Sequence, residues 1–149
     1  MECVILIGAQ ASGKSTFFRA RFFRTHVRIN LDMLRTRHRE ARLLESCLEM
    51  QQPFVVDNTN PSREDRSRYI APARLAGFRV SGYYFQSRID DVLRRNLGRP
   101  EDERIPEPGI RGTHARLERP RMDEGFDSLH YVSLLDPDGF RVDEWIDEV

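Results

Sequence analysis

Five stretches of mainly apolar residues recur along the chain, and polar segments with helical periodicity separate them. They predict strands at residues 2–7, 27–30, 53–57, 80–86 and 130–135. The first and third stretches are apolar at nearly every position, which is typical of parallel strands buried on both faces. Strands that alternate with helices predict an α/β fold, with a parallel sheet of four to five strands and helices on both faces.

The segments between these strands carry the end signals of helices. They predict helices at residues 14–25, 33–50, 61–76 (after an Asn60 cap) and 88–97 (after a capping box of Ser87 and Asp90). In the second helix, Leu34, Leu44 and Leu48 recur on one face. Residues 99–112 mix charge with proline and glycine, which predicts a loop or a mobile lid, and residues 136–139 predict a turn.

The segment between the first strand and the first helix, Gly-Ala-Gln-Ala-Ser-Gly-Lys-Ser-Thr at residues 8–16, matches the phosphate-binding pattern G-x-x-x-x-G-K-[ST]. The residues expected to bind the nucleotide are Gly8, Ala11, Ser12, Gly13, Lys14, Ser15 and Thr16. In such a loop Lys14 reaches the β- and γ-phosphates, and the Ser15 hydroxyl is the expected metal ligand for Mg²⁺. The pattern predicts ATP or another nucleoside triphosphate, with Mg²⁺, as the cofactors.

An ordinary strand-to-helix turn is the alternative interpretation of this segment. Such a turn needs neither the second glycine nor the lysine. Of the 24 lysine and arginine residues in the chain, Lys14 is the only lysine. This exception indicates a role that arginine cannot fill, namely a compact ammonium on a flexible stem.

Three polar segments follow strand ends, at residues 8–16, 30–35 and 57–60, and we expect them to meet at one edge of the sheet. Asp32 could there accept the proton of an acceptor hydroxyl, although helix N-capping is an equally open role for it. Arg35 follows one helical turn later, on the same face, and could hold an anionic group of the acceptor. Ordinary ion pairs on helices have the same spacing.

Residues after the second and third strands, together with a group in the lid, resemble a known family. They are Val-Val-Asp-Asn-Thr-Asn-Pro at 55–61, Asp32 with Arg35, Arg-Asn-Leu-Gly-Arg at 95–99 and Arg-Ile-Pro at 104–106. Together they look like the polynucleotide 5′-hydroxyl kinases of the phage and animal repair type, over residues 4 to about 132. The resemblance implies a three-layer P-loop kinase fold with an arginine-rich lid at about residues 95–117.

The resemblance also implies roles that spacing could not assign. It implies that Asp32 is the general base and that Arg35 holds the acceptor's 3′-phosphate. The residues it implies for the lining of the acceptor pocket are Asp57, Asn58, Thr59 and Asn60. It implies that Arg95 and Arg99 act in catalysis by contacting the transferring phosphates, which suits a planar and permanently charged side chain. A solvated basic helix end is the alternative for these two arginines.

The lid differs from the family pattern in its proline and glycine content. These residues are Pro106, Pro108, Gly109 and Gly112, and they stand where the family has a firm helix. We therefore expect a looser lid. The roles of Arg104 and Arg111 stay open.

The chain is formally neutral, but residues 19–42 hold eight arginines against only Asp32 and Glu40. This basic flank suits a polyanionic partner, although solvated helix faces would give the same composition. At 149 residues the chain is expected to form a single domain, 1–149. Cys3 and Cys47 look like small buried hydrophobes of a reducing compartment. No signal peptide or long apolar stretch is present, so a cytoplasmic protein that binds no membrane, and is a monomer or weak oligomer, is expected.

These features together predict an ATP-dependent polynucleotide 5′-hydroxyl kinase. Its partner would be DNA or RNA with a 5′-hydroxyl end, and its setting would be nucleic-acid repair. A kinase of a small alcohol, such as an antibiotic, sugar or nucleoside, could use Asp32 in the same way but would not need Arg35 or the basic flank. A nucleotide-binding switch without transfer chemistry would leave Asp32, Arg95 and Arg99 unexplained.

Overall fold

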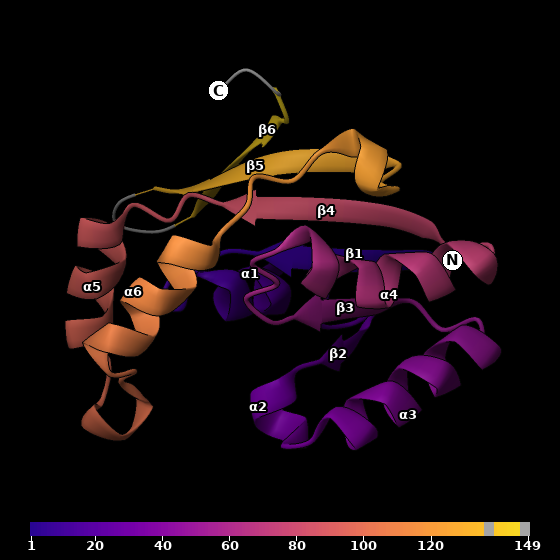
Figure 1. The fold of residues 1–149 in the computed structure, drawn as a ribbon, viewed down its shortest axis with the longest axis horizontal. Coiled ribbons are helices and arrows are strands. Elements are labelled where there is room, and N and C mark those ends of the chain that lie inside the picture. Colours follow the sequence, from indigo (N-terminus) through magenta and orange to yellow (C-terminus); the bar gives the residue numbers. More distant parts are fainter. Residues whose placement is uncertain (136–138, 147–149) are drawn as a thin grey trace.

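The central strand, β1 (Glu2–Ile7), leads directly into the phosphate-binding loop. The computed structural model describes residues 1–135 and 139–146. In these residues the sheet has six strands in the order β2-β3-β1-β4-β5-β6 (Figure 1). The other strands are β2 (Val27–Ile29), β3 (Phe54–Asp57), β4 (Arg79–Phe85), β5 (Ser128–Leu134) and β6 (Phe140–Glu144). β1 to β5 are mutually parallel, which confirms the expected α/β fold.

Helices cover both faces of the sheet (Figure 1). They are α1 (Lys14–Arg21), α2 (Leu31–Leu34), α3 (Arg37–Glu49), α4 (Arg63–Leu75), α5 (Ile89–Leu97) and α6 (Glu107–Arg116), with 3-10 turns η1 (Glu101–Glu103) and η2 (Met122–Glu124). Phe17 and Phe18 of α1 pack on one face, against alternate residues of β1. Leu44 of α3 and Ile70 of α4 pack on the opposite face. The central strands are therefore buried on both sides, as their apolar sequences indicate.

The lid is firmer than its composition predicts, because α6 forms across the proline- and glycine-rich segment. Pro106 is the N-cap of this helix and Pro108 lies in its first turn. Backbone N–H groups at these positions make no hydrogen bond within a helix, so proline, which lacks the N–H, is tolerated there. Fully buried Ile110 packs there against Val92 of α5. Asn96 also exchanges two hydrogen bonds with the backbone of Ile105, at 2.7 and 2.9 Å. The expectation of a loose lid is wrong for these reasons.

The helix predicted at residues 33–50 is confirmed over Arg37–Glu49, but its predicted start is wrong, because the chain breaks between α2 and α3. Arg35 adopts a φ of 78°, which stops α2. The Thr36 hydroxyl then accepts a hydrogen bond from Arg39 N at 3.1 Å and caps a new helix. Asn30 caps α2 in the same way, through Met33 N at 2.9 Å.

Two other predicted helix caps have different roles. Ser62, not Asn60, caps α4, since Asn60 adopts a positive φ of 46° ahead of Pro61. The predicted capping box at Ser87 and Asp90 is absent from α5, whose N-cap Arg88 makes no side-chain cap bond. Ser87 instead accepts a hydrogen bond from Ala9 N of the phosphate-binding loop at 3.1 Å.

The pattern of the C-terminal part did not predict β6, which pairs antiparallel with β5. Gly139, at φ 109°, accepts a hydrogen bond from Leu135 N at 3.0 Å. Residues 136–138 of the predicted turn lie outside the described residues. Within the described ranges, 1–135 and 139–146, none of the helices is long and apolar enough to cross a membrane.

Candidate functional site

The carboxyl ends of the parallel strands face the lid helices (Figure 1). A cavity of about 470 Å³ lies at this end of the sheet. Its walls come from the phosphate-binding loop, the start of α2, the segment after β3, the facing sides of α3 and α4, and the lid. The polar residues predicted from the sequence that line it are Lys14, Ser15, Thr16, Asp32, Asp57, Asn58, Thr59, Asn60 and Arg99. The three segments expected to meet at this edge of the sheet therefore share one cavity.

The phosphate-binding loop has backbone angles that its sequence supports. Gly13, the N-cap of α1, adopts a φ of 97°, and a Cβ there would come within 2.9 Å of the Leu134 side chain. The buried Lys14 ammonium folds back on the loop, where it donates to Gly8 O at 2.9 Å, Ala9 O at 2.7 Å and Ser12 Oγ at 3.3 Å. These contacts hold the cation at the centre of the loop, in the position to meet phosphate oxygens.

Burial lowers the pKa of Lys14 from 10.5 to about 8. The carboxylates of Asp57 and Asp32 oppose this effect, and the Arg99 guanidinium adds to it. A cation surrounded by few negative charges is destabilised in this site. An anionic ligand such as a triphosphate would remove that penalty.

Ser15 at the start of α1 and Asp57 at the end of β3 meet beside the loop. Ser15 Oγ donates to Asp57 Oδ2 at 2.9 Å, and Asp57 is almost fully buried at the end of β3. Arg28 of β2 contacts both, through Nε to Asp57 Oδ2 at 2.8 Å and Nη2 to Ser15 Oγ at 3.1 Å. Asp57 was expected to line the acceptor pocket, and it does line the shared cavity, but its carboxylate bonds are to Ser15 and Arg28.

The oxygens of Ser15 and Asp57 fit Mg²⁺, which favours hard oxygen ligands. Within the described residues, His, Cys, Asp and Glu side chains do not gather in threes to form a metal cluster. Mg²⁺ is commonly held by one or two protein oxygens together with substrate phosphates, and the pair has this number and type of ligand.

Asp32 lies at the second position of α2, is exposed, and is one of the residues that line the shared cavity. It is not the N-cap, because Asn30 has that role. Among the described residues no group forms a hydrogen bond or ion pair with this carboxylate. The alternative that explained Asp32 as a helix cap is therefore wrong, and the carboxylate is available to a ligand.

Arg35 does not share a helix face with Asp32, since it lies exposed at the break between α2 and α3. The predicted pairing of these two residues on one face is wrong. The cationic side chains lining this part of the cavity are Arg37 of α3 and Arg68 of α4. The sequence contained one signal of the break, the capping residue Thr36, but the continuous apolar periodicity outweighed it.

A hydrogen-bonded group that the sequence did not reveal forms the wall near Arg37. The fully buried Tyr69 hydroxyl accepts from Arg37 Nη1 and Asn58 Nδ2, each at 3.2 Å. Glu40, also buried, accepts from Arg37 at 2.8 Å and from Asn58 at 2.9 Å. Burial raises the pKa of Tyr69, so its hydroxyl keeps its proton. Asn58 is thereby fixed at the cavity wall, with its Oδ1 accepting from Leu31 N at 2.8 Å.

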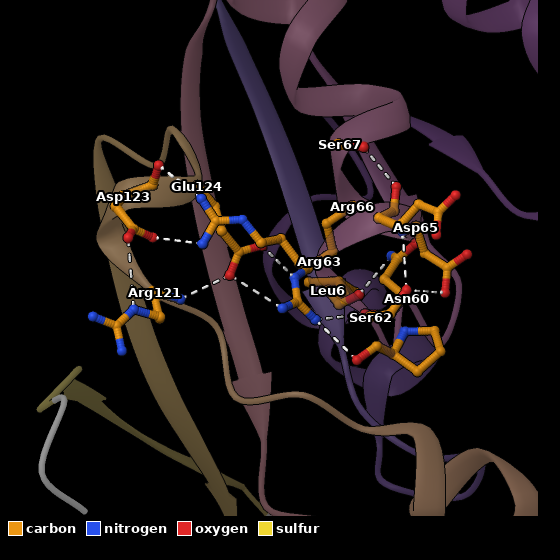
Figure 2. Close-up of polar contacts among 12 residues, drawn as sticks. Leu6, Asn60, Ser62, Arg63, Asp65, Arg66, Ser67, Arg121, Asp123 and Glu124 are labelled. Atoms are coloured by element: carbon orange, nitrogen blue, oxygen red, sulfur yellow. Dashed lines mark hydrogen bonds and ion pairs between the residues drawn. The ribbon is translucent and has the colours of Figure 1, made fainter.

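Thr59 and Asn60, which line the cavity, are fixed by hydrogen bonds to the backbone of β1 and the phosphate-binding loop. Thr59 O accepts from Gly8 N at 3.0 Å, and Asn60 Nδ2 donates to Leu6 O at 2.8 Å. Arg66 of α4 stabilises this turn by donating to Asn60 O and Pro61 O at 3.1 Å each (Figure 2). The guanidinium of Arg66 is fully buried and pairs with Glu124 at 2.8 and 3.1 Å (Figure 2).

The lid arginines differ in whether they lie at the cavity, near the phosphate-binding loop, or on the exposed surface of the lid. Arg99 lines the cavity, together with Arg116, which the sequence did not single out. Arg95 approaches the phosphate-binding loop through Nη1 and Ala11 O at 3.5 Å. Arg104 and Arg111 are exposed and bond within the lid, to Arg99 O and Glu107 at 2.9 Å each.

A further contact joins lid and loop, since Gln10 Nε2 donates to buried Thr113 Oγ1 at 3.0 Å.

A family model described as an AAA domain matches residues 3–120 of the chain. The bifunctional polynucleotide phosphatase/kinase of Schizosaccharomyces pombe is 27% identical over 135 residues, which are 88% of this chain and 33% of that protein. The chain thus spans about a third of the length of this curated relative.

Two solved structures share the fold. Kti12 of Chaetomium thermophilum, in complex with ADP-AlF3, is 16% identical with a TM-score of 0.67, over 91% of this chain and 90% of that one. A sugar kinase from Janibacter sp. is also 16% identical, with a TM-score of 0.62, over 89% of this chain and 85% of that one.

Proposed function

The chain belongs to the AAA domain family and is a P-loop kinase-like domain, and we propose that it transfers the γ-phosphoryl group of ATP to the 5′-hydroxyl of a nucleic acid. The observation that carries the proposal is that Asp32 shares one cavity with Lys14 and with the Ser15–Asp57 pair. Phosphoryl transfer requires the phosphates to be held, their charge to be offset and a base to stand near the attacking oxygen. These residues supply the three requirements.

In the proposed reaction, the acceptor oxygen forms a bond to the γ-phosphorus while the bond to the β-γ bridging oxygen breaks. Asp32 accepts the hydroxyl proton, and ADP leaves with the bridging oxygen. Lys14 and Arg99 offset charge on the phosphate oxygens. Ser15 and Asp57 would hold Mg²⁺, which supplies charge neutralisation when bound with the nucleotide.

The polynucleotide class of the acceptor is proposed on two supports. The first is the likeness to a relative named as a polynucleotide phosphatase/kinase. The second is that Arg37 and Arg68 line the cavity from two different helices on the acceptor side. Guanidinium groups suit the phosphate that follows the terminal nucleoside in a nucleic acid. A setting in nucleic-acid repair is part of the same proposal.

The test is to incubate the protein with γ-labelled ATP and a panel of acceptors. The panel contains 5′-hydroxyl oligonucleotides of DNA and RNA, their 5′-phosphorylated forms, nucleosides and sugars. The proposal requires label on the 5′-hydroxyl oligonucleotides and none on the 5′-phosphorylated controls. Preferential label on a sugar or free nucleoside would instead identify a small-molecule kinase. Nucleotide binding with no labelled acceptor would support a nucleotide-binding switch.

A further inference from the structure

A second cavity, of about 230 Å³, lies beside the candidate active site on the α1 side of the sheet. It is lined by Ser15, Phe18, Arg19, Phe23 and Arg28, and we call it the α1 groove. Ser15 lines both cavities, so the groove begins where the larger cavity ends. Ser15 and Arg19 lie four residues apart on one face of α1, and Phe23 lies just beyond the end of that helix.

The α1 groove lies in the most uncompensated basic part of the chain. Residues 14–31 contain five cationic side chains and neither Asp nor Glu. Acidic groups from other elements pair with two members of this segment: Asp57 with Arg28, and Glu2 with His26. Within residues 1–135 and 139–146, Arg19 forms no ion pair or hydrogen bond. Its guanidinium is thus free to bind an anion.

The groove also has one exposed aromatic ring, that of Phe23. Phe23 is 69% exposed, whereas Phe18 beside it is buried in the core. An exposed ring next to an unpaired arginine has the two features by which proteins hold single-stranded nucleic acid, namely stacking on bases and attraction to the backbone.

We propose that the α1 groove binds a single-stranded segment of the acceptor, beyond the terminal nucleoside held near Asp32. Phe23 stacks on a base and Arg19 binds a backbone phosphate. The identification of this segment as part of the acceptor rests on the proposed function. The groove itself rests on its own residues, so the two proposals can fail separately.

The test compares Arg19→Ala and Phe23→Ala with the matched control Arg42→Ala. Arg42 is an exposed arginine of the same basic flank, on α3, with only a 3.8 Å contact to exposed Glu45. Binding of a 12-nucleotide single strand with a 5′-hydroxyl and a 3′ fluorophore is measured by anisotropy with ADP present. Thermal melting and ADP affinity establish that each variant is folded.

We expect Phe23→Ala to weaken binding of the 12-mer by about 5- to 150-fold, the range for loss of one stacked base. Arg19→Ala should weaken binding and also reduce the salt slope, log K against log salt, by about 0.7, which corresponds to one phosphate contact. Phe23→Ala should leave that slope unchanged. Arg42→Ala should bind as the wild type does. A blunt duplex, which has no unstacked base, should show no dependence on Phe23.

The groove is overturned if Arg19→Ala and Phe23→Ala bind the single strand as Arg42→Ala does, even when oligonucleotides are phosphorylated normally. Equal Phe23 dependence for duplex and single strand would also contradict base stacking. Conversely, strong dependence on both residues in a protein that labels no acceptor would support the groove while removing the proposed kinase function.

Discussion

Ser15 and Asp57 lie 42 positions apart in the sequence, yet a 2.9 Å hydrogen bond joins their side chains. The Arg28 guanidinium donates a hydrogen bond to an oxygen of each. The guanidinium thus contacts the same two oxygens that are proposed to face Mg²⁺. A resident cation of this kind stabilises a buried carboxylate while the metal is away, and competes with the metal for it.

Arg28→Ala should therefore have opposite effects on the empty and the metal-bound protein. Loss of charged hydrogen bonds should lower the free energy of unfolding of the empty protein by about 1.5–3 kcal/mol. The Mg²⁺ concentration that half-saturates ADP binding should fall, because Asp57 has lost its competing cation. Thermal melting with and without Mg²⁺ and ADP measures both effects, with Arg42→Ala as the control. An unchanged requirement for Mg²⁺ would show that Asp57 does not face the metal.

Lys14→Met should abolish transfer while the protein stays folded. The side chain is the central cation of the loop, and its pKa, lowered by burial, shows that the charged form is destabilised there. Labelled-phosphate transfer and thermal melting provide the measurements. Transfer at the wild-type rate in Lys14→Met would remove the phosphate-binding role of the loop.

The same pKa predicts a pH dependence. A group with a folded pKa of about 8 and an ordinary value of 10.5 releases its proton on folding between these limits, so the protein should gain stability as pH rises through that window. Phosphate binding needs the charged form, so ADP affinity should fall about tenfold per pH unit above pH 8. Calorimetry of ADP binding from pH 7 to 10 tests this, and Lys14→Met should remove both slopes.

Asp32→Asn should reduce kcat by about 10²–10⁴-fold, the usual contribution of a general base, and leave ADP affinity unchanged. Its melting temperature should match the wild type, because Asn30 is the cap of α2. Asn30→Ala is the matched control and should lower the free energy of unfolding by about 0.5–2 kcal/mol. Full activity of Asp32→Asn would place the base elsewhere.

In the lid, Arg99→Ala should lower kcat more than it raises KM, because its charge faces the cavity where phosphate charge develops. Arg99→Lys should restore part of the activity, since it keeps the charge but loses the planar fork. Arg104→Ala, a change at an exposed neighbour whose side chain donates to Arg99 O, should have a much smaller effect. The reverse order would mean that the lid closes on phosphate with a different arginine.

Arg68→Ala should selectively remove the preference for an acceptor with a 3′-phosphate. A charged contact to phosphate gives such an acceptor an advantage of about 10- to 150-fold in kcat/KM over the bare nucleoside, and the variant should lose most of it. Arg35→Ala is the control, since Arg35 is exposed at the helix break. Loss of the preference in Arg35→Ala alone would show that α2 moves when the acceptor binds.

Local patterns predicted the strands and the phosphate-binding loop because both depend on neighbours in the sequence. β1 is fully apolar from Cys3 to Ile7, and the loop motif follows it at once. β6 was missed because Phe140 and Val142 are only half-buried at the edge of the sheet, and their alternation is short.

The acceptor wall was less predictable because it depends on contacts between distant elements. Arg37 and Tyr69 meet around Asn58 only when α3 and α4 pack beside the end of β3. The predicted position of Arg35 was wrong because its own positive φ ends the helix and changes the direction of the chain. The spacing of apolar residues does not reveal such a change in a backbone angle. The sequence thus predicted where the site lies, and the structure was needed to show which arginines reach it.

The buried pair of Arg66 and Glu124 has a consequence for how this domain can be divided. The family match ends at residue 120, before Glu124, whereas Arg66 lies at the back of the acceptor segment. A protein truncated at that boundary would leave the Arg66 guanidinium without its carboxylate partner, and it would also lose β5, which pairs with β4. The smallest unit that can be transplanted or fused with an intact acceptor wall must therefore include both η2 and β5.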